Sequence, residues 1–311
     1  MADFKKKLYI VAGPTGVGKS LYAINLAKKI NGEIISLDSV QIYKYLDIGS
    51  GKITSNEMQG INHYMISEIE PNINFNIKQF KDLANKYINI IYKNNKIPIL
   101  VGGSGFYIHA VLYDNDFLYE DYEVSKKIRD DLYKKIEVDG IDSLHEDLKK
   151  IDVNSYENIP RNNIKKIISA IEFYKIHNMK LSEYNSLQRR KESEFDFIFY
   201  VLIKDRKELY DKINSRVDEM IDKGLLLEVK FLIDKGLDLS YNSMKSIGYK
   251  ELYEFCKNKT NIELENYKNF SMNDKMILEN CIDLIKKNSR NYAKRQITWF
   301  KREKEIRWVK V

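Results

Sequence analysis

Residues 9–30 read YIVAGPTGVGKSLYAINLAKKI: a short apolar stretch, a glycine-rich turn and a stretch with helical spacing. A turn of the form G-x-x-x-x-G-K-S between a strand and a helix is typical of a P-loop, which binds phosphate groups. The turn consists of Gly13, Pro14, Thr15, Gly16, Val17, Gly18, Lys19 and Ser20. This order predicts a phosphate site and leaves open which phosphates it binds.

Each kind of residue in this turn has a physical role beside a phosphate. Glycines allow successive backbone N–H groups to point toward an anion, and the N-terminus of the helix adds partial positive charge. Lys19 supplies a full positive charge, and the hydroxyl of Ser20 is a candidate ligand for Mg²⁺. The alternative is a glycine turn without a ligand, which gives no reason for the complete spacing.

Strands and helices alternate in the N-terminal part of the chain. We expect strands at residues 8–13, 32–39, 62–67 and 97–105, and helices at residues 20–30 and 77–95. Such alternation favours a parallel sheet with helices on both faces, and ligands of such sheets bind beyond the carboxyl ends of the strands. Gly13–Ser20, Asp38–Gln41 and Gly102–Gly105 all fall at predicted strand ends.

The character of the chain changes at residue 114. Residues 114–194 are highly charged, almost free of glycine and helical in pattern, whereas residues 195–203 read as a strand and residues 205–233 as a helix. We therefore predict an α/β protein: a P-loop parallel sheet flanked by helices, with a helical insertion domain. The P-loop core comprises residues 1–113 and 195–311 with basic C-terminal helices, and the insertion comprises residues 114–194.

The positive charge is concentrated at the C-terminus. Residues 286–311 contain ten Lys or Arg and two Glu, a net charge of +8, while the whole chain of 311 residues carries +7. A basic segment of this kind suits a polyanion such as nucleic acid. The alternative interpretation is a solvated helix face.

Cysteine content and hydropathy narrow the class of protein. Cys256 and Cys281 form no C-x-x-C pair, which argues against a zinc site and fits a reducing compartment. The apolar run after the N-terminal lysines is short and leads into the P-loop, so it reads as a strand and not as a signal peptide. No apolar run approaches the roughly 18 residues that a membrane span requires. We expect a cytoplasmic protein with no membrane contact.

The acidic residue nearest the P-loop lies in an unusual place for an ATPase. In many P-loop enzymes a second strand ends in Asp, which organises Mg²⁺. Here the buried strand at Ile97–Val101 runs into Gly-Gly-Ser-Gly, and the acidic strand end is Asp38. A carboxylate beside a phosphate site holds a metal through water or acts as a general base. A general base requires an acceptor substrate with a proton to lose.

Several motifs occur in the order found in one enzyme family. GPTGVGKS, DSVQIYKYLDIGSGK, GINHYMI, IPILVGGSGFY, SIGYKE and RNYAKRQITWF together resemble bacterial tRNA dimethylallyltransferases, over about Leu8 to Lys301. The resemblance implies transfer of a dimethylallyl group from dimethylallyl diphosphate to N6 of the adenine just 3′ of the anticodon, with Mg²⁺ as cofactor. The implied partners are dimethylallyl diphosphate and the anticodon stem-loop of tRNA.

The resemblance also assigns roles to residues beside the P-loop. Asp38 matches the acid that accepts or orients the N6 proton, and it is the first catalytic candidate. Ser39, Val40 and Gln41 match the segment that contacts the target adenine and its neighbours. Ser104, a catalytic and tRNA-binding candidate, stands where the family has a Thr that binds the leaving diphosphate, and it keeps the hydroxyl.

Two arginines match family residues farther along the chain. Arg216 resembles a diphosphate-binding arginine and is the third catalytic candidate. Arg129 matches an arginine near the leaving group or the tRNA, in an alignment that allows a shift of two positions. A surface salt bridge is the alternative interpretation for each of them.

The chain departs from the family pattern at two places. The family usually has two adjacent histidines where this chain has Asn62 and His63, and His63 alone reads more simply as a structural histidine. In the insertion, Lys165 and Lys166 stand at the family's basic pair, but Ser169 replaces an Arg. We include these last three residues among the tRNA-binding candidates, because two lysines still contact phosphates.

The last motif carries the basic segment. Lys294 and Arg295 are candidates for contacts with tRNA phosphates. Tyr292 and Trp299 lie on one face of the predicted helix, where core packing is the favoured interpretation and base stacking the alternative.

Two other functions compete with prenyl transfer. A small-molecule or nucleoside kinase would turn over ATP without RNA and leaves the basic C-terminus unexplained. A non-catalytic RNA-binding protein would keep its role without Asp38. The absence of a long unassigned apolar stripe favours a monomer.

Overall fold

The structure is a computed structural model, which describes residues 5–113, 118, 122–188 and 192–311. The chain divides into two compact units, one formed by Met1–Leu112 with Glu194–Val311 and the other by Tyr113–Ser193. The boundary that the sequence predicts at Asp114 lies outside the described residues. Each unit is described separately below.

The first unit is built on a parallel sheet. Within the described residues the sheet has six strands in the order β3-β2-β4-β1-β5-β6, and every neighbouring pair is parallel. The strands are β1 (Lys6–Ala12), β2 (Gly32–Ser36), β3 (His63–Tyr64), β4 (Ile97–Gly102), β5 (Phe195–Ile203) and β6 (Ile306–Lys310). The predicted α/β fold with a parallel sheet and flanking helices is confirmed.

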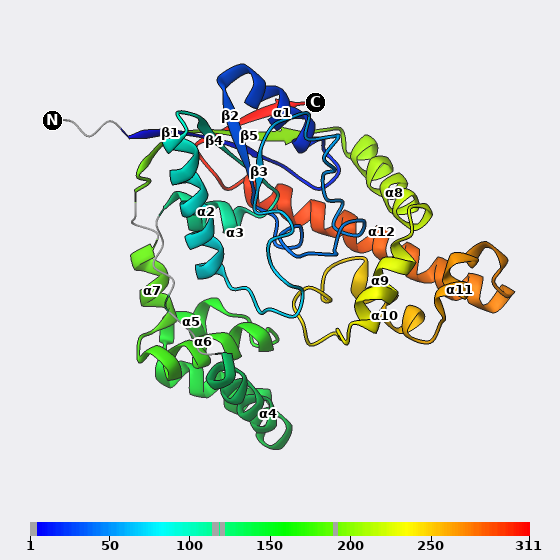
Figure 1. Ribbon diagram of the computed structural model, residues 1–311. Coiled ribbons are helices and arrows are strands. Elements are labelled where there is room, and N and C mark those ends of the chain that lie inside the picture. Colours follow the sequence, from blue (N-terminus) through cyan, green and yellow to red (C-terminus); the bar gives the residue numbers. More distant parts are fainter. Residues whose placement is uncertain (1–4, 114–117, 119–121, 189–191) are drawn as a thin grey trace. The chain divides into compact units, whose positions relative to one another are not determined.

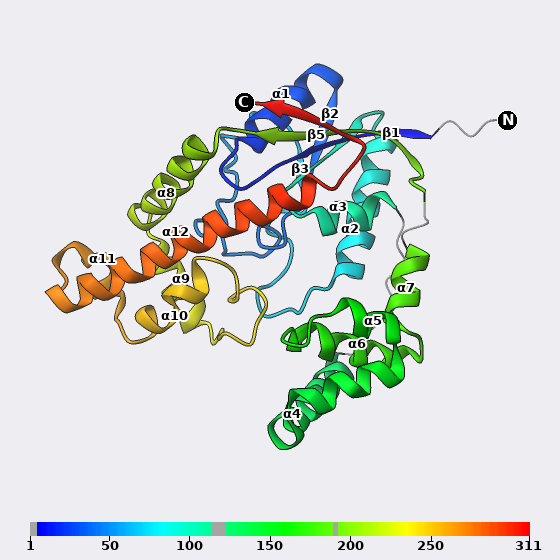
Figure 2. The ribbon, with the colours of Figure 1, turned by 180° about the vertical axis from the view of Figure 1, so that it is seen from behind.

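Helices cover both faces of this sheet (Figure 1). The helices of this unit are α1 (Lys19–Ile30), α2 (Ile77–Lys93), α3 (Gly105–Leu112), α8 (Arg206–Asp222), α9 (Leu225–Asp234), α10 (Tyr249–Lys257), α11 (Asn261–Glu265) and α12 (Met272–Phe300). Of these, α9, α10 and α11 lie away from the sheet, and α10 packs against α9 and α12. Tyr200 on β5 contacts Tyr22 of α1, and its neighbour Phe199 contacts Phe300 of α12. Because successive strand residues point to opposite faces, α1 and α12 lie on opposite sides. Figure 2 shows the C-terminal end of α12 beneath the sheet, near α3.

Local sequence accounts for these elements where its signals are strong. Helix α2 begins at a capping box, in which the Asn76 side chain accepts from the Gln79 N–H and the Gln79 side chain accepts from the Asn76 N–H. Its buried residues Phe80, Ala84 and Ile88 follow the helical period. No helix among the described residues combines the length and the apolar character that a membrane crossing requires.

Three predicted elements differ from the structure. The single helix expected at residues 205–233 is two helices, because Gly224 adopts φ +99° between α8 and α9. The strand expected at residues 62–67 is limited to β3 (His63–Tyr64). The basic C-terminus is not helical throughout, because β6 (Ile306–Lys310) adds a strand beside β5.

The described residues of the second unit are helical. They form α4 (Tyr122–Ile151), α5 (Val153–Asn158), α6 (Ile164–His177) and α7 (Leu181–Gln188), with a kink in α4 at Gly140. The core of this unit contains Leu132, Leu144, Leu148, Ile167, Ile168, Ala170 and Ile171. These residues come mainly from α4 and α6, which pack against each other.

Candidate functional site

The P-loop connects β1 to α1, as its sequence predicts. A Cβ atom on Gly13 would lie 2.7 Å from the backbone oxygen of Leu202 on β5, so only glycine fits at this close approach. Gly18 precedes α1, and Lys19 is the first residue of the helix. The free N–H groups at this helix N-terminus therefore stand beside the loop, as in an anion site.

Lys19 occupies the site as a partly desolvated cation. Its Nζ donates a hydrogen bond to the backbone oxygen of Pro14 over 2.9 Å. Burial lowers the pKa of Lys19 to about 8, and the nearby charge of Asp38 opposes this effect. A diphosphate beside Lys19 would stabilise the ammonium form in the same way as Asp38 does.

One pocket brings together the ends of three neighbouring strands. It is lined by Lys19 and Ser20 after β1, by Asp38 and Gln41 after β2, and by Gly102 at the end of β4. The predicted meeting of these segments follows from the parallel order β2-β4-β1. The pocket therefore places a cation, a hydroxyl and a carboxylate around one volume.

Asp38 uses its two carboxylate oxygens differently. Oδ1 accepts hydrogen bonds from the backbone N–H of Val40 at 2.9 Å and of Gln41 at 3.3 Å. These bonds are those of an Asx turn, which fixes the side chain relative to its own backbone. Oδ2 accepts no hydrogen bond from any residue that the structure describes. This arrangement leaves one oxygen to act on a ligand.

Arg216 reaches the same region from α8. Its Nη2 donates to the backbone oxygen of Gly51 over 3.2 Å, and its charge acts on Lys19. Burial lowers the pKa of Arg216, and the negative charge of Asp38 opposes this effect. An arginine nevertheless stays charged in a protein. A Cβ on Gly51 would lie 1.5 Å from this Nη2, and Gly51 has φ +57°. Sequence reasoning overlooked Gly51, although DIGSGK was among the quoted motifs.

The second glycine turn, residues 102–105, packs closely against α12. Ser104 lies between β4 and α3 and is partly exposed. A Cβ on Gly103 would lie 2.1 Å from Nε2 of Gln296, and one on Gly105 would lie 2.1 Å from the ring of Trp299. These two glycines therefore have a packing role that the strand-end pattern did not reveal.

Gln296 connects the two glycine turns and was absent from the predicted site. Its Oε1 accepts from the N–H of Thr15 at 2.9 Å, and its Nε2 donates to the oxygen of Gly103 at 2.9 Å. The side chain is buried. The available signal was a polar residue on the helix face that also buries Ala293 and Phe300.

Aromatic residues surround Asp38 and its neighbour Ser39. Burial raises the pKa of Tyr292 to about 12, and the charge of Asp38 contributes. Ser39 lines a second cavity with Tyr43, Phe75, Phe80, Tyr107, Asn242 and Ser246. Trp299 packs edge-on against His109, with ring centroids 4.6 Å apart. Trp299 thus has the packing contacts expected of a core residue.

Other predicted residues do not line this pocket. Lys294 and Arg295 are exposed on α12. Arg129 belongs to the second unit, where its Nε donates to both oxygens of the buried Glu172 carboxylate, at 2.8 and 2.9 Å. This ion pair is the salt-bridge alternative for Arg129, whose side chain is still 48% exposed, and a contact with the leaving group or the tRNA stays a prediction. On α6 of the same unit, three tRNA-binding candidates are exposed, namely Lys165, Lys166 and Ser169.

Asn62 and His63, which stand where the family usually has two histidines, lie at the start of β3. Asn62 Nδ2 donates to the buried carboxylate of Glu33 over 2.6 Å. His63 lines the P-loop pocket, its Nδ1 lies 2.8 Å from the oxygen of Ile61, and burial lowers its pKa. A neutral His63 with a backbone partner fits the structural interpretation.

The donor set can accept a magnesium ion that comes with a diphosphate. Among the described residues, no group of three or more His, Cys, Asp and Glu side chains could hold a metal. The pocket offers the Ser20 hydroxyl and the Asp38 carboxylate, which are oxygen ligands. Mg²⁺ commonly takes one or two protein oxygens together with phosphate oxygens and water. These residues therefore fit Mg²⁺ bound with a phosphate ligand.

A family model and a curated relative both identify the same enzyme family. The model of the IPP transferase family matches residues 41–303, which is more than half of the chain. A tRNA dimethylallyltransferase of Lachnoclostridium phytofermentans is 43% identical over 302 residues, covering 97% of this chain and 91% of that protein.

Solved structures agree with this match. A tRNA isopentenylpyrophosphate transferase from Staphylococcus epidermidis is 39% identical with a TM-score of 0.65, covering 98% of this chain and 93% of that one. Its counterpart from Bacillus halodurans is 36% identical with a TM-score of 0.67, covering 98% and 90%. A eukaryotic dimethylallyltransferase acting on tRNA is 26% identical with a TM-score of 0.77, covering 98% and 74%.

Proposed function

The chain belongs to the IPP transferase family, and we propose that it transfers a dimethylallyl group from dimethylallyl diphosphate to N6 of the adenine just 3′ of the anticodon in tRNA. The names of its relatives support the reaction and the class of acceptor. The observation that carries the proposal is the P-loop pocket, in which Lys19, Ser20 and Asp38 line one volume. A phosphate-binding cation and a general base thus face each other.

The reaction breaks a carbon–oxygen bond. The N6 nitrogen attacks C1 of the dimethylallyl group, and the C1–O bond breaks with both electrons leaving on the diphosphate. The proton lost from N6 passes to Oδ2 of Asp38, the oxygen without a partner among the described residues. Oδ1 stays bound to two N–H groups and holds the carboxylate in place during this transfer.

The leaving diphosphate gains negative charge in the transition state. The N–H groups of the P-loop and the Lys19 ammonium stabilise that charge, together with Arg216, whose charge acts on Lys19 and Asp38. Ser104, at the start of α3, is the further hydroxyl that we assign to the diphosphate. Ser20 would hold Mg²⁺ together with the phosphates, and the ion would supply additional charge stabilisation of the leaving group.

Other residues are assigned to the RNA. Ser39, Val40 and Gln41 follow Asp38 and would contact the target adenine and adjacent nucleotides. Exposed side chains elsewhere would contact the phosphates of the anticodon stem-loop, namely Lys165, Lys166 and Ser169 on α6 and Lys294 and Arg295 on α12. An unstacked base in a single-stranded loop reaches such a pocket at low cost. Arg129 keeps its assignment to the tRNA, and its bonds to Glu172 support the fold of the insertion.

The proposal includes a monomeric enzyme of the cytoplasm. Size-exclusion chromatography with light scattering tests the first point, and cell fractionation tests the second. A stable dimer or a membrane-bound enzyme would each contradict the corresponding statement.

The experiment that tests the function uses purified protein, Mg²⁺, unmodified tRNA and dimethylallyl diphosphate. A parallel reaction contains ATP in place of the prenyl donor, and both tRNA samples are digested to nucleosides for mass spectrometry. We expect an adenosine heavier by one dimethylallyl group in the first reaction only. ADP formation in the second reaction, with no mass shift in the first, would favour the kinase alternative.

A further inference from the structure

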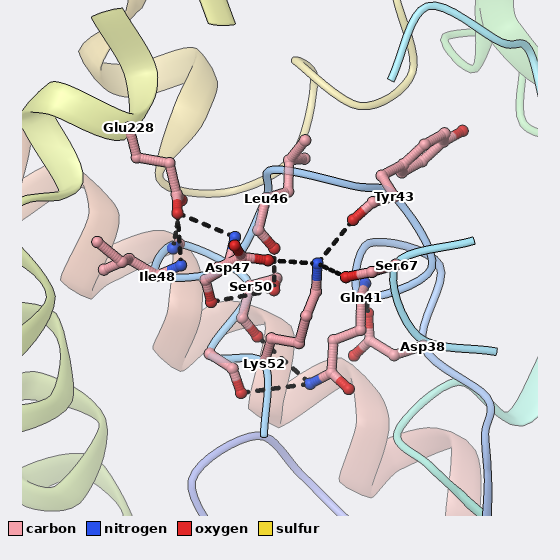
Figure 3. A network of polar contacts seen from close by, with 12 residues as sticks. Asp38, Gln41, Tyr43, Leu46, Asp47, Ile48, Ser50, Lys52, Ser67 and Glu228 are labelled. Carbon is pink, nitrogen blue, oxygen red and sulfur yellow. Dashed lines mark hydrogen bonds and ion pairs between the residues drawn. The ribbon is translucent and has the colours of Figure 1, made fainter. Parts of the chain in front are cut away.

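A carboxylate outside the P-loop pocket accepts hydrogen bonds from residues 47–49, in the same loop between β2 and β3 that carries Asp38 (Figure 3). Glu228 on α9 accepts through Oε2 from the backbone N–H of Asp47 at 2.9 Å and of Ile48 at 2.7 Å. Its Oε1 accepts from the N–H of Gly49 at 2.9 Å and from the hydroxyl of Tyr249 at 2.7 Å. Four donors therefore converge on one side chain.

The chemistry of this contact requires an acceptor at both oxygens. Three successive N–H groups that point to one place form an anion-binding concavity. Here the anion is a side chain of the same protein, and an ionised carboxylate is a pure acceptor. Burial, followed by the negative charge of Glu228, raises the pKa of Tyr249 well above its usual value, so this hydroxyl remains a donor.

The fit of the turn also depends on Tyr249. A Cβ on Gly49 would lie 2.6 Å from the ring of Tyr249, so the turn sits directly against that ring. The second end of the loop is held by Lys52, whose Nζ donates to the oxygen of Tyr43, to Asp47 and to Ser67 over 2.6 to 2.7 Å. Figure 3 shows both attachments on the same loop.

The backbone carbonyl groups of Ser50 and Gly51, which follow this turn, accept hydrogen bonds from residues assigned to the substrates. The Gly51 oxygen accepts from Arg216 at 3.2 Å and from the side chain of Gln41 at 3.4 Å, and the Ser50 oxygen accepts from Gln41 at 3.5 Å. The backbone N–H of Gln41 in turn donates to Asp38. The N–H side of the loop is thus fixed by Glu228, while its carbonyl side aligns Arg216 and Gln41.

We propose that Glu228 is a positioning residue for the transfer reaction: it fixes residues 47–51 so that Arg216 and Gln41 face the diphosphate and the acceptor base. The proposal rests on the proposed function, because it names the substrates that those two residues contact. Glu228 itself does not line the P-loop pocket, so it acts through the loop and not on the substrate.

Glu228→Gln is the informative variant. An amide keeps the shape of the side chain but turns one acceptor into a donor, which would face N–H groups of the loop. We expect KM for dimethylallyl diphosphate to rise about tenfold and kcat to fall, since hydrogen bonds to a charged group are lost. The Kd for tRNA should stay within about twofold of wild type, because the phosphate contacts that dominate it are elsewhere.

Two further variants separate positioning from folding. Glu254→Gln makes the same chemical change at an exposed position of α10 and should match wild type in every parameter. Tyr249→Phe keeps the ring against Gly49 but removes one of the four donors, and it should raise KM for dimethylallyl diphosphate about threefold. A purely structural defect would lower apparent kcat through the folded fraction and leave KM unchanged. That pattern in both Glu228→Gln and Tyr249→Phe would overturn the proposal, and Tyr249→Phe alone decides the point if Glu228→Gln does not fold.

A double-mutant cycle tests whether Glu228 acts through Arg216. If it does, adding Glu228→Gln to Arg216→Ala should change kcat/KM less than about twofold, because the guanidinium to be aligned is already absent. Effects that simply add would overturn the assignment. Wild-type protein provides the separate check on function: if it forms no prenylated adenosine, the proposed function fails, whereas a prenylating wild type with unaffected variants rejects only the role of Glu228.

Discussion

At the residue scale, the two charges that face each other in the P-loop pocket are both held by their own backbone. Asp38 is fixed by the N–H groups of Val40 and Gln41, and Lys19 is fixed by the oxygen of Pro14. Such preorganisation means that little rearrangement is needed when a substrate binds. Substitutions that keep these local bonds but change the charge should therefore affect chemistry more than structure.

Asp38→Asn is a substitution of this kind. The amide oxygen keeps the bonds to Val40 and Gln41, but the side chain no longer accepts a proton. We expect prenyl transfer to fall by about 10²- to 10⁴-fold, the usual contribution of a general base. The Kd for tRNA should remain within about twofold, as measured by filter binding. Turnover at the wild-type rate would remove Asp38 from the mechanism.

The lowered pKa of Lys19 predicts how substrate binding depends on pH. In the free protein this group loses its proton near pH 8 and not near 10.5, whereas a bound diphosphate favours the ammonium. Affinity for dimethylallyl diphosphate should therefore be constant below about pH 7 and fall as pH rises above 8, by up to about tenfold per unit.

Calorimetry at pH 9, in two buffers of different ionisation enthalpy, should detect proton uptake on binding. Lys19→Arg keeps its charge throughout this range and should show neither the decline nor the uptake. The same pH profile in both proteins would assign the effect to another group.

At the element scale, α12 contacts both glycine turns beside the site. Gln296 links the P-loop to the second glycine turn, and Trp299 fills the space that Gly105 leaves open. The positions of both turns are therefore set in part by one helix near the C-terminus.

Gln296→Leu tests how much this link contributes to the stability of the fold. The substitution leaves a part-buried N–H of Thr15 and a buried carbonyl of Gly103 without this partner, which should lower the free energy of unfolding by about 1–3 kcal/mol. Urea denaturation measures this change. Thr298→Val, at an exposed position of the same helix, is the control and should stay within about 0.5 kcal/mol of wild type. A variant as stable as wild type would show that the link is dispensable.

What the sequence predicts well at this scale is local. The P-loop, the strand that precedes Asp38 and the helix α2 depend on neighbouring residues, and all are present in the structure, although β2 ends at Ser36. Contacts between distant segments escaped prediction: Gln296 is 281 residues from Thr15, and the need for Gly51 depends on Arg216 of another helix. Strand β6 was missed because its short sequence follows a long basic helix and gains its partners only from β5.

At the scale of the whole molecule, positive charge is spread over the C-terminal segment. The ten Lys and Arg of residues 286–311 divide between α12, the turn after it and β6. Some have partners in the protein: Lys286 lies 2.6 Å from Asp218, and Arg290 donates to Asn214. Lys294 and Arg295 are exposed, and these two are the residues that we assign to RNA phosphates.

Reversing both charges, with Lys294→Glu and Arg295→Glu, should weaken tRNA binding and reduce the dependence of log Kd on log salt by about one to two units. A salt titration monitored by fluorescence anisotropy measures both quantities. Lys28→Glu with Lys29→Glu, at the end of α1 remote from the P-loop, makes the same change in net charge and should preserve the slope. Equal effects of the two pairs would indicate a response to net charge alone.

The central claim is that the P-loop holds a prenyl diphosphate and that the bond broken is the carbon–oxygen bond. The most direct measurement counts two products of one reaction that contains tRNA, Mg²⁺, dimethylallyl diphosphate and ATP: released inorganic pyrophosphate, and dimethylallyl-adenosine in the digested tRNA. We predict equal amounts of the two products at every time point, with ATP left intact. Consumption of ATP without dimethylallyl-adenosine, or orthophosphate in place of pyrophosphate, would contradict the account.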